Sequence, residues 1–382
     1  MLIISYDAIG DKQFDRLLQY PVFNAFAKQC AVFRDVSTIF ISNTYPVHTS
    51  VATGVLPCEH GITSNAEAFP SPNQLWNFDE ALIRVKTIWQ LASKKGIKTA
   101  AVLWPVTGFS KSINYNIPEV RAMPGKSQLL TSLKAGSPFL QFKMYLRHRS
   151  LLNGIKQPNL DFFSTACMVY ILREKKPGLS LVHLTAYDFI CHDNGLDSAA
   201  LDAAYDAMDK NLAALLAAAD GDDIVLFSDH SQININKVID PNSALAGMGL
   251  INQTDNGYLP GENNCFAECG GGSAFFHAGK LTNDKTNEIR SMFSSSEGFR
   301  RFLTNEELRE TGRENAAFGF CAKAGFCYEI FGTEKKGNHG YPLDMPDYKV
   351  FYMTRGCGQK PGINHGGSLL DIAPLVIRHL GL

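Results

Sequence analysis

The hydrophobic positions of this chain gather in short runs, and three of these runs end on an aspartate. They are Leu2–Asp7, Leu181–Asp188 and Ile224–Asp229. Short apolar runs of this kind are typical of buried strands in a parallel sheet. Because ligands of open α/β sheets bind outside the carboxyl ends of the strands, the three carboxylates should meet at one rim. Carboxylates gathered there would repel one another without a cation between them, so the pattern predicts a metal site.

Stretches with helical periodicity separate these strands. Apolar residues in steps of four and three between Leu201 and Leu215 predict an amphipathic helix that ends before Gly221. This helix would join the second of the three strands to the third as a βαβ unit. Further strands are predicted at 31–37, 99–103 and 350–353, and further helices at 14–30, from residue 88 to Gly96, and after Asp371. The alternation predicts an α/β fold with a mostly parallel central sheet.

Two stretches interrupt this alternation, at 106–175 and 231–337. The first carries a basic patch from Lys143 to Arg149, which we interpret as a solvated face. The second contains Gly270-Gly271-Gly272, which we interpret as a turn because no helix signature follows it. We therefore expect a single domain over residues 1–382, with both stretches as cap insertions beside the strand rim.

Composition narrows the class of protein. The chain has 382 residues, of which 36 are basic and 37 acidic, so a nucleic-acid polymer is not an expected partner. No run reaches the roughly 20 apolar residues of a membrane helix, and no membrane partner is expected. The first strand begins at Leu2, so no signal peptide is expected, and the nine scattered cysteines are interpreted as reduced thiols of a cytoplasmic protein. The pairs Cys265/Cys269 and Cys321/Cys327 leave a structural zinc site as the alternative.

The strand endings supply candidate metal ligands. Asp188 and His192 are four residues apart, a spacing that lets both reach one ion from a helical turn, and Asp229 is followed directly by His230. Together with Asp7 they offer oxygen and nitrogen ligands, which suit zinc better than manganese or iron. Two ions about 3.5–4 Å apart would form a clamp for a phosphoryl group. The alternative is that each aspartate is an ordinary helix or turn cap.

The segment Ile41–Gly54 is the second informative stretch. Pro46 suits the first turn of a helix that Gly54 could close. Thr44 would then lie at the helix N-terminus, where free backbone N–H groups favour a phosphate. A threonine hydroxyl activated there could attack phosphorus, although Thr44 could also be an ordinary N-cap.

At this point the chain resembles the type I phosphodiesterase/nucleotide pyrophosphatase family of the alkaline phosphatase superfamily. The resemblance rests on six motifs that occur in the family's order: Thr44 to His48 with Thr53-Gly54, His60-Gly61-Ile62, Asp188-x-x-x-His192-x-x-Gly195, Ser228-Asp229-His230, Gly337 to Tyr341, and Asp371 to Pro374. It implies an α/β, alkaline phosphatase-like three-layer sandwich and a small phosphoester or nucleotide substrate. His48 and His60 are interpreted as structural hydrogen-bonding residues.

The resemblance also implies roles for individual residues. Thr44 corresponds to a nucleophile that forms a phosphothreonine. One of two divalent ions, preferably Zn²⁺, would be held by Thr44, Asp7, Asp229 and His230, and the other by Asp188, His192 and His339. His339 is assigned from the resemblance alone, in preference to His365.

One position departs from the family pattern as we interpret it. The third residue after the nucleophile is Val47, where the pattern has an asparagine that contacts a phosphate oxygen. Asn65 is a candidate substitute donor, and a turn residue is the alternative. Phosphonoacetate hydrolases have a comparable arrangement of threonine and asparagine, which motivates a second hypothesis beside the first. The three hypotheses are a phosphodiester or phosphoanhydride hydrolase acting through Thr44, a phosphonate hydrolase, and a catalytically silent metal-binding module. The sequence leaves the oligomeric state open.

Overall fold

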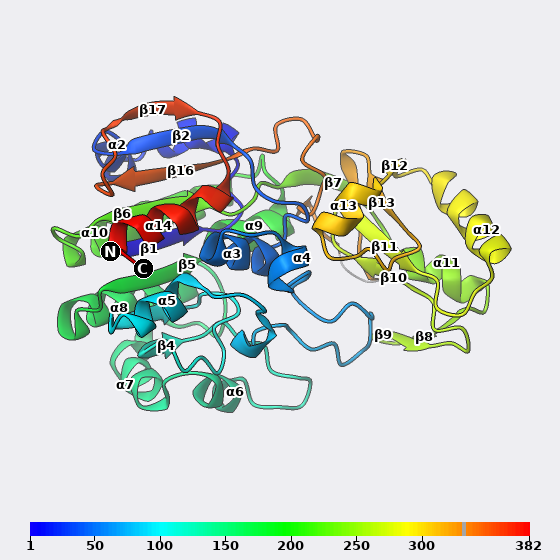
Figure 1. The fold of residues 1–382 in the computed structure, drawn as a ribbon, viewed down its shortest axis with the longest axis horizontal. Coiled ribbons are helices and arrows are strands. Elements are labelled where there is room, and N and C mark those ends of the chain that lie inside the picture. The colour runs from blue at the N-terminus through cyan, green and yellow to red at the C-terminus, as the bar shows by residue number, and fades with distance from the viewer. Residues whose placement is uncertain (331–333) are drawn as a thin grey trace.

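An eight-stranded, mostly parallel sheet forms the centre of the molecule (Figure 1). The computed structural model describes residues 1–330 and 334–382. The strands of the sheet, in spatial order, are β17 (Gly362–His365), β2 (Ala31–Val36), β16 (Val350–Arg355), β6 (Ile224–Ser228), β1 (Leu2–Tyr6), β5 (Leu179–Leu184), β3 (Thr99–Val102) and β4 (Tyr115–Ile117). β16 runs antiparallel to both of its neighbours, whereas β1 pairs in parallel with β5 and β6. The predicted sheet class is confirmed.

Helices cover both faces of this sheet, and the side chains of β1 point alternately into the two cores that result. Leu2, Ile4 and Tyr6 contribute to one core and Ile3 to the other. The helices of the first core include α2 (Pro21–Ala27), α8 (Asn159–Lys175), α9 (Ala186–Asn194) and α10 (Leu201–Ala218). Those of the second include α3 (Thr44–Thr53), α5 (Ile88–Lys94) and α14 (Ile372–Leu380). The three-layer sandwich that the family resemblance implies is confirmed.

One boundary prediction was wrong. The run Leu181–Asp188 was expected to be a strand that ends on Asp188, but β5 ends at Leu184 and α9 begins at Ala186. The carboxylate of Asp161 on α8 accepts hydrogen bonds from the backbone N–H groups of Thr185 and Ala186, at 3.0 and 2.9 Å. This cap comes from a residue far away in the sequence, so the local pattern could not show where the helix begins.

A second layered unit lies beside the main sheet, at the right of Figure 1. Its core includes Phe276, Phe318 and Phe320. Its strands are β7 (Ile233–Ile239), β8 (Ile251–Thr254), β9 (Gly257–Pro260), β10 (Phe266–Cys269), β11 (Ser273–His277), β12 (Phe299–Phe302), β13 (Phe318–Ala322), β14 (Gly325–Tyr328) and β15 (Gly337–Asn338); its helices are α11 (Pro241–Gly247), α12 (Asn283–Ser294) and α13 (Asn305–Glu310). Most of the predicted insertion 231–337 forms this unit, and its residues 331–333 lie outside the described residues.

The other predicted insertion, 106–175, is mainly helical. It contains α6 (Gln128–Ala135), α7 (Pro138–His148) and α8, and α8 packs against α10 and the sheet. In Figure 1, α6 and α7 lie together beyond the edge strand β4. The remaining short helices are α1 (Phe14–Leu17), α4 (Pro57–His60) and 3-10 turns at Asp11–Gln13, Glu80–Leu82, Arg149–Leu151 and Leu369–Asp371. Within the described residues, we find no helix with the length and apolar character that crossing a membrane requires.

Candidate metal centre and catalytic threonine

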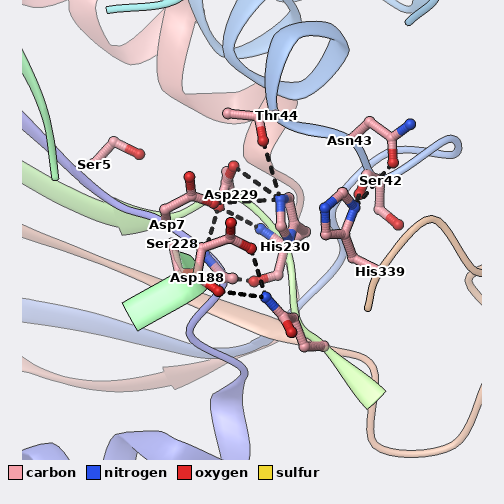
Figure 2. A network of polar contacts seen from close by, with 12 residues as sticks. Ser5, Asp7, Ser42, Asn43, Thr44, Asp188, Ser228, Asp229, His230 and His339 are labelled. Atoms are coloured by element: carbon pink, nitrogen blue, oxygen red, sulfur yellow. Dashed lines mark hydrogen bonds and ion pairs between the residues drawn. The ribbon is translucent and has the colours of Figure 1, made fainter. Parts of the chain in front are cut away.

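The first group of site residues lies at the carboxyl ends of two neighbouring strands. Asp7 follows β1, and Asp229 and His230 follow β6. Because Tyr6 pairs with Ser228 in the parallel register, both strands deliver their next residues to one rim. Nε2 of His230 lies 3.4 Å from Oδ1 of Asp7 and 3.4 Å from Oδ2 of Asp229. Figure 2 shows these side chains converging on one point.

Thr44 faces this group from the start of α3. It is the first residue of the helix, Pro46 lies in its first turn, and Gly54 closes it with a left-handed φ of 77°. The N-cap residue is Asn43, so the alternative that Thr44 is the N-cap was wrong. Oγ1 of Thr44 lies 3.5 Å from Nε2 of His230 (Figure 2). The hydroxyl is therefore near the rim carboxylates and at a helix N-terminus, the two features that a phosphoryl-accepting nucleophile needs.

The second group comes from α9 and from the residue after β15. Nε2 of His192 lies 3.3 Å from Oδ1 of Asp188, and His339 approaches from the second layered unit. Nδ1 of His192 donates to the carbonyl of Gly337 at 2.7 Å, and Nδ1 of His339 lies 2.9 Å from Oδ1 of Asn43. These contacts leave Nε2 of each imidazole as the available ligand atom. The ligand atoms of Asp188, His230 and His339 lie within 4.8 Å of one another, so the two groups adjoin.

The triple-glycine turn holds His339 in place. Gly271 lies between β10 and β11 with a φ of 76°, and a Cβ there would approach the carbonyl oxygen of His339 to 2.2 Å. Gly340 has a φ of 82°, and its Cβ would lie 1.8 Å from the carbonyl oxygen of Gly270. The backbone of Gly272 also donates to the carbonyl of His339 at 2.7 Å. The turn predicted from Gly270-Gly271-Gly272 thus packs directly against the segment that carries a candidate ligand.

Burial and mutual repulsion shape the charges of the cluster. Burial, together with Asp229 and Asp188, raises the pKa of Asp7 well above its ordinary value. For Asp188 burial acts in the same direction, but the imidazole of His192 outweighs it and lowers the pKa. Burial lowers the pKa of His339, which keeps the ring neutral. Oδ1 of Asp7 and Oδ2 of Asp229 are buried and have no hydrogen-bond donor. Buried carboxylate oxygens without donors, beside imidazole nitrogens, fit divalent cations.

A buried histidine behind Asp7 was missed in the sequence. Nε2 of His183 lies 3.2 Å from Oδ2 of Asp7, and its Nδ1 lies 3.7 Å from Glu119. Burial opposes the charged imidazole, but Asp7 and Glu119 outweigh it and raise the pKa of His183 well above its ordinary value. The signal was an imidazole inside the buried and mostly apolar β5, next to the strand that precedes Asp7.

Three further histidines considered in the sequence have structural partners. His48 lies 2.8 Å from the carbonyl of Thr44 through Nδ1 and 2.9 Å from the hydroxyl of Ser5 through Nε2. His60 contacts the hydroxyl of Ser50 at 2.9 Å. His365 is exposed on β17, where it pairs with Asp35. The structure therefore places His339, and not His365, beside the other candidate ligands.

Asn65 lies at the cavity and Val47 does not. A cavity of about 410 Å³ is lined by Thr44, Asn65 and most of the candidate ligands. Oδ1 of Asn65 accepts the backbone N–H of Tyr45 at 2.9 Å, which leaves its amide N–H groups available. Val47 is fully buried, together with Val51, in the core between α3 and the central sheet. A side chain at position 47 packs against the sheet, so valine there does not remove a donor from the cavity.

Two ion pairs lie at the wall of the cavity, of which Glu268–Arg313 is buried and Glu329–Lys335 is half-buried. Arg313 binds Glu268, which lines the cavity, and also donates to the carbonyl of Thr63 at 2.8 Å. Lys335 lies 3.0 Å from Glu329.

All nine cysteines are unpaired thiols, and among the described residues no cysteine belongs to a possible metal-binding group.

Comparison with known proteins places this geometry in a family. Residues 1–301 match the profile of type I phosphodiesterase/nucleotide pyrophosphatase. The chain is 26% identical over 124 residues to bis(5'-adenosyl)-triphosphatase enpp4 of Xenopus laevis, covering 31% of this chain and 26% of that protein. It is 28% identical over 116 residues to human ectonucleotide pyrophosphatase/phosphodiesterase family member 5, covering 28% and 24%. These matches span about a quarter of the length of the curated relatives.

The fold also matches known structures. Murine ectonucleotide pyrophosphatase/phosphodiesterase 5 aligns with a TM-score of 0.71 and 18% identity over 100% of this chain and 95% of that one. The human protein aligns with a TM-score of 0.70 and 17% identity over the same shares. This likeness confirms the alkaline phosphatase-like fold. Since the family profile covers most of the sequence, the chain belongs to the type I phosphodiesterase/nucleotide pyrophosphatase family.

Proposed function

We propose that this protein is a metal-dependent hydrolase of phosphodiester or phosphoanhydride bonds that acts through a phosphothreonine on Thr44. The observation that carries the proposal is the position of the Thr44 hydroxyl, at the start of α3 and 3.5 Å from His230 among the rim carboxylates. Membership of the family supports the class of reaction.

The metal ions would occupy two adjoining groups of residues. Asp7, Asp229 and His230 with Thr44 would hold one, and Asp188, His192 and His339 the other. The donor-free oxygens of Asp7 and Asp229 support this assignment, because divalent cations would satisfy them. When bound, such ions supply Lewis-acid stabilisation of the negative charge on the phosphoryl oxygens and on the nucleophile. The nitrogen and oxygen donor set favours zinc.

The residues of the chain perform the remaining work. Thr44 loses its proton, Oγ1 bonds to phosphorus, and the bond from phosphorus to the leaving oxygen breaks, so that the leaving group departs and takes up a proton. Water then attacks the same phosphorus, the bond to Oγ1 breaks, and the second half of the substrate is released as a phosphate monoester while Thr44 regains a proton. Asn65, which already fixes the backbone of Tyr45, presents its amide to a phosphoryl oxygen. The lining residues Glu119 and Glu268 place parts of both predicted insertions at the cavity, and we propose that these stretches cap the bound substrate.

Nucleotides are the proposed substrate class. A related structure contains AMP, and a relative is named for diadenosine triphosphate hydrolysis. The hypothesis of a phosphonate hydrolase loses one of its two motives because Val47 lies in the core, whereas Asn65 lines the cavity. It remains an outcome of the substrate panel.

The test compares Thr44→Ala and Thr44→Ser with the unchanged chain on zinc-loaded protein. Substrates are bis(4-nitrophenyl) phosphate, diadenosine triphosphate and phosphonoacetate. We expect Thr44→Ala to lower kcat by at least about a thousandfold with little change in zinc content, and Thr44→Ser to retain part of the activity. Mass spectrometry of acid-quenched protein should find a 4-nitrophenyl phosphoryl group on Thr44 after reaction with bis(4-nitrophenyl) phosphate.

Three results would contradict parts of this account. Unchanged turnover in Thr44→Ala would overturn the mechanism. Phosphate release from phosphonoacetate alone would favour the phosphonate hydrolase. Absence of bound metal together with no hydrolysis of any substrate would favour the silent module.

A further inference from the structure

The helical hairpin of α6 and α7 exposes an unusual number of large apolar side chains. Phe139 is 91% exposed, Phe142 58% and Leu146 53%. These three residues follow a spacing of three and four on α7, so they form one stripe. Leu129 and Leu130 on α6 and Ile155 beyond α7 are also exposed. Exposed large apolar side chains gathered in one element mark a candidate site of interaction.

The opposite side of α7 is what holds the hairpin to the protein. Gln141 and Met144 are buried there, and Gln141 contacts both the hydroxyl and the carbonyl of Ser132 on α6. In Figure 1 the two helices lie at the lower margin of the molecule, beyond the edge strand β4. The apolar stripe is therefore presented outward by an anchored element.

The charge of the same stretch is one-sided. Between residues 120 and 160 the sequence has seven Lys or Arg and no Asp or Glu, while the rest of the chain holds the other 29 basic residues and all 37 acidic ones. The seven are Arg121, Lys126, Lys134, Lys143, Arg147, Arg149 and Lys156. Lys143 and Arg147 lie beside the stripe on α7, and both are exposed. Aromatic and aliphatic residues flanked by Lys and Arg are typical of helices that lie on an anionic membrane surface.

We propose that the α6–α7 hairpin docks this protein on the surface of an anionic lipid bilayer, with Phe139, Phe142 and Leu146 entering the interface. A second copy of the chain is disfavoured as the occupant, because a symmetric contact would bring two acid-free basic surfaces together. A nucleic acid would leave the aliphatic side chains without a role. The expectation of no membrane partner came from the lack of a spanning run, which does not bear on a surface contact.

Docking would also orient the catalytic cavity. Arg121 and Met123, at the start of the same stretch, line a second cavity that shares Gln74 and Trp76 with the catalytic one. The segment that begins at Arg121 therefore connects the neighbourhood of the catalytic cavity to the α6–α7 hairpin.

The test is co-sedimentation of the full chain with vesicles of phosphatidylcholine containing phosphatidylserine, and with vesicles of phosphatidylcholine alone. One variant replaces the stripe (Phe139→Ser, Phe142→Ser, Leu146→Ser), and a second replaces charges (Lys126→Gln, Lys134→Gln, Arg149→Gln, Lys156→Gln). Matched controls are Ile363→Ser, an exposed apolar residue on β17, and the exposed lysines Lys94→Gln, Lys95→Gln and Lys360→Gln.

We expect the unchanged chain to sediment with the anionic vesicles, and added salt to weaken this binding. Each of the two hairpin variants should lower the partition coefficient by about a hundredfold, whereas the controls should not change it. Melting temperature and hydrolysis of a soluble diester should be unchanged, since none of these residues lines the catalytic cavity.

Three outcomes would overturn the proposal: no binding to anionic vesicles, equal binding by hairpin variants and controls, or a dimer that the stripe variant converts to monomer without any vesicle binding. The last would assign the face to a second copy of the chain.

Discussion

The two halves of the candidate metal centre are built in different ways. Asp7, Asp229 and His230 follow adjacent parallel strands, so the register of one sheet sets their positions. Asp188 and His192 come from a helix, and His339 comes from the second layered unit, where a glycine turn packs against it. The first half depends on local strand geometry, whereas the second depends on how two units of the chain pack together.

Removing a ligand from each half should separate their roles most strongly. We expect Asp229→Asn to lower kcat by at least about a thousandfold, because it disturbs the group next to the Thr44 hydroxyl. His192→Asn should cost about a hundredfold, since the nucleophile keeps its own surroundings. Steady-state kinetics on bis(4-nitrophenyl) phosphate would measure both effects, with His365→Asn as an off-site control. Equal losses in the two variants would remove the proposed division of labour.

The glycine turn tests whether packing between the units controls the second half. Gly340→Ala should lower the free energy of unfolding by about 3 kcal/mol, because its Cβ would overlap the carbonyl of Gly270. Gly366→Ala is a matched control: its φ is +81°, yet nothing lies within 4 Å of the added Cβ. The control should cost about 1 kcal/mol. Denaturant unfolding measures both, and equal costs would show that backbone conformation, and not crowding beside His339, sets the penalty.

The buried ion pair of Glu268 and Arg313 joins the second unit to the segment before Asn65. Burial opposes the charge of Glu268, but Arg313 outweighs it and lowers the pKa from 4.5 to about 2. The pair therefore contributes stability that is present above about pH 4.5 and is lost as the pH falls toward 2. We expect the free energy of unfolding to fall by about 2 kcal/mol between roughly pH 5 and pH 2.5 from this group. Glu268→Gln should remove that part of the pH dependence, and an unchanged profile would contradict the account.

The same contrast explains what the sequence could predict. Apolar runs and helical periodicity predicted the central sheet, and the endings of two strands predicted the positions of Asp7 and Asp229. The boundary before Asp188 was wrong because Asp161 caps α9 across a long separation in the sequence. His339 needed the family resemblance, because a turn from another unit places it. Val47 was misjudged since its direction depends on how α3 packs on the sheet.

The most direct test of the central claim is the zinc content of purified, zinc-loaded and dialysed protein, measured by elemental analysis. The account predicts about two ions per chain in the unchanged protein and about one in each of Asp229→Asn and His192→Asn. Retention of two ions by both variants, or the absence of bound metal from the unchanged chain, would contradict it.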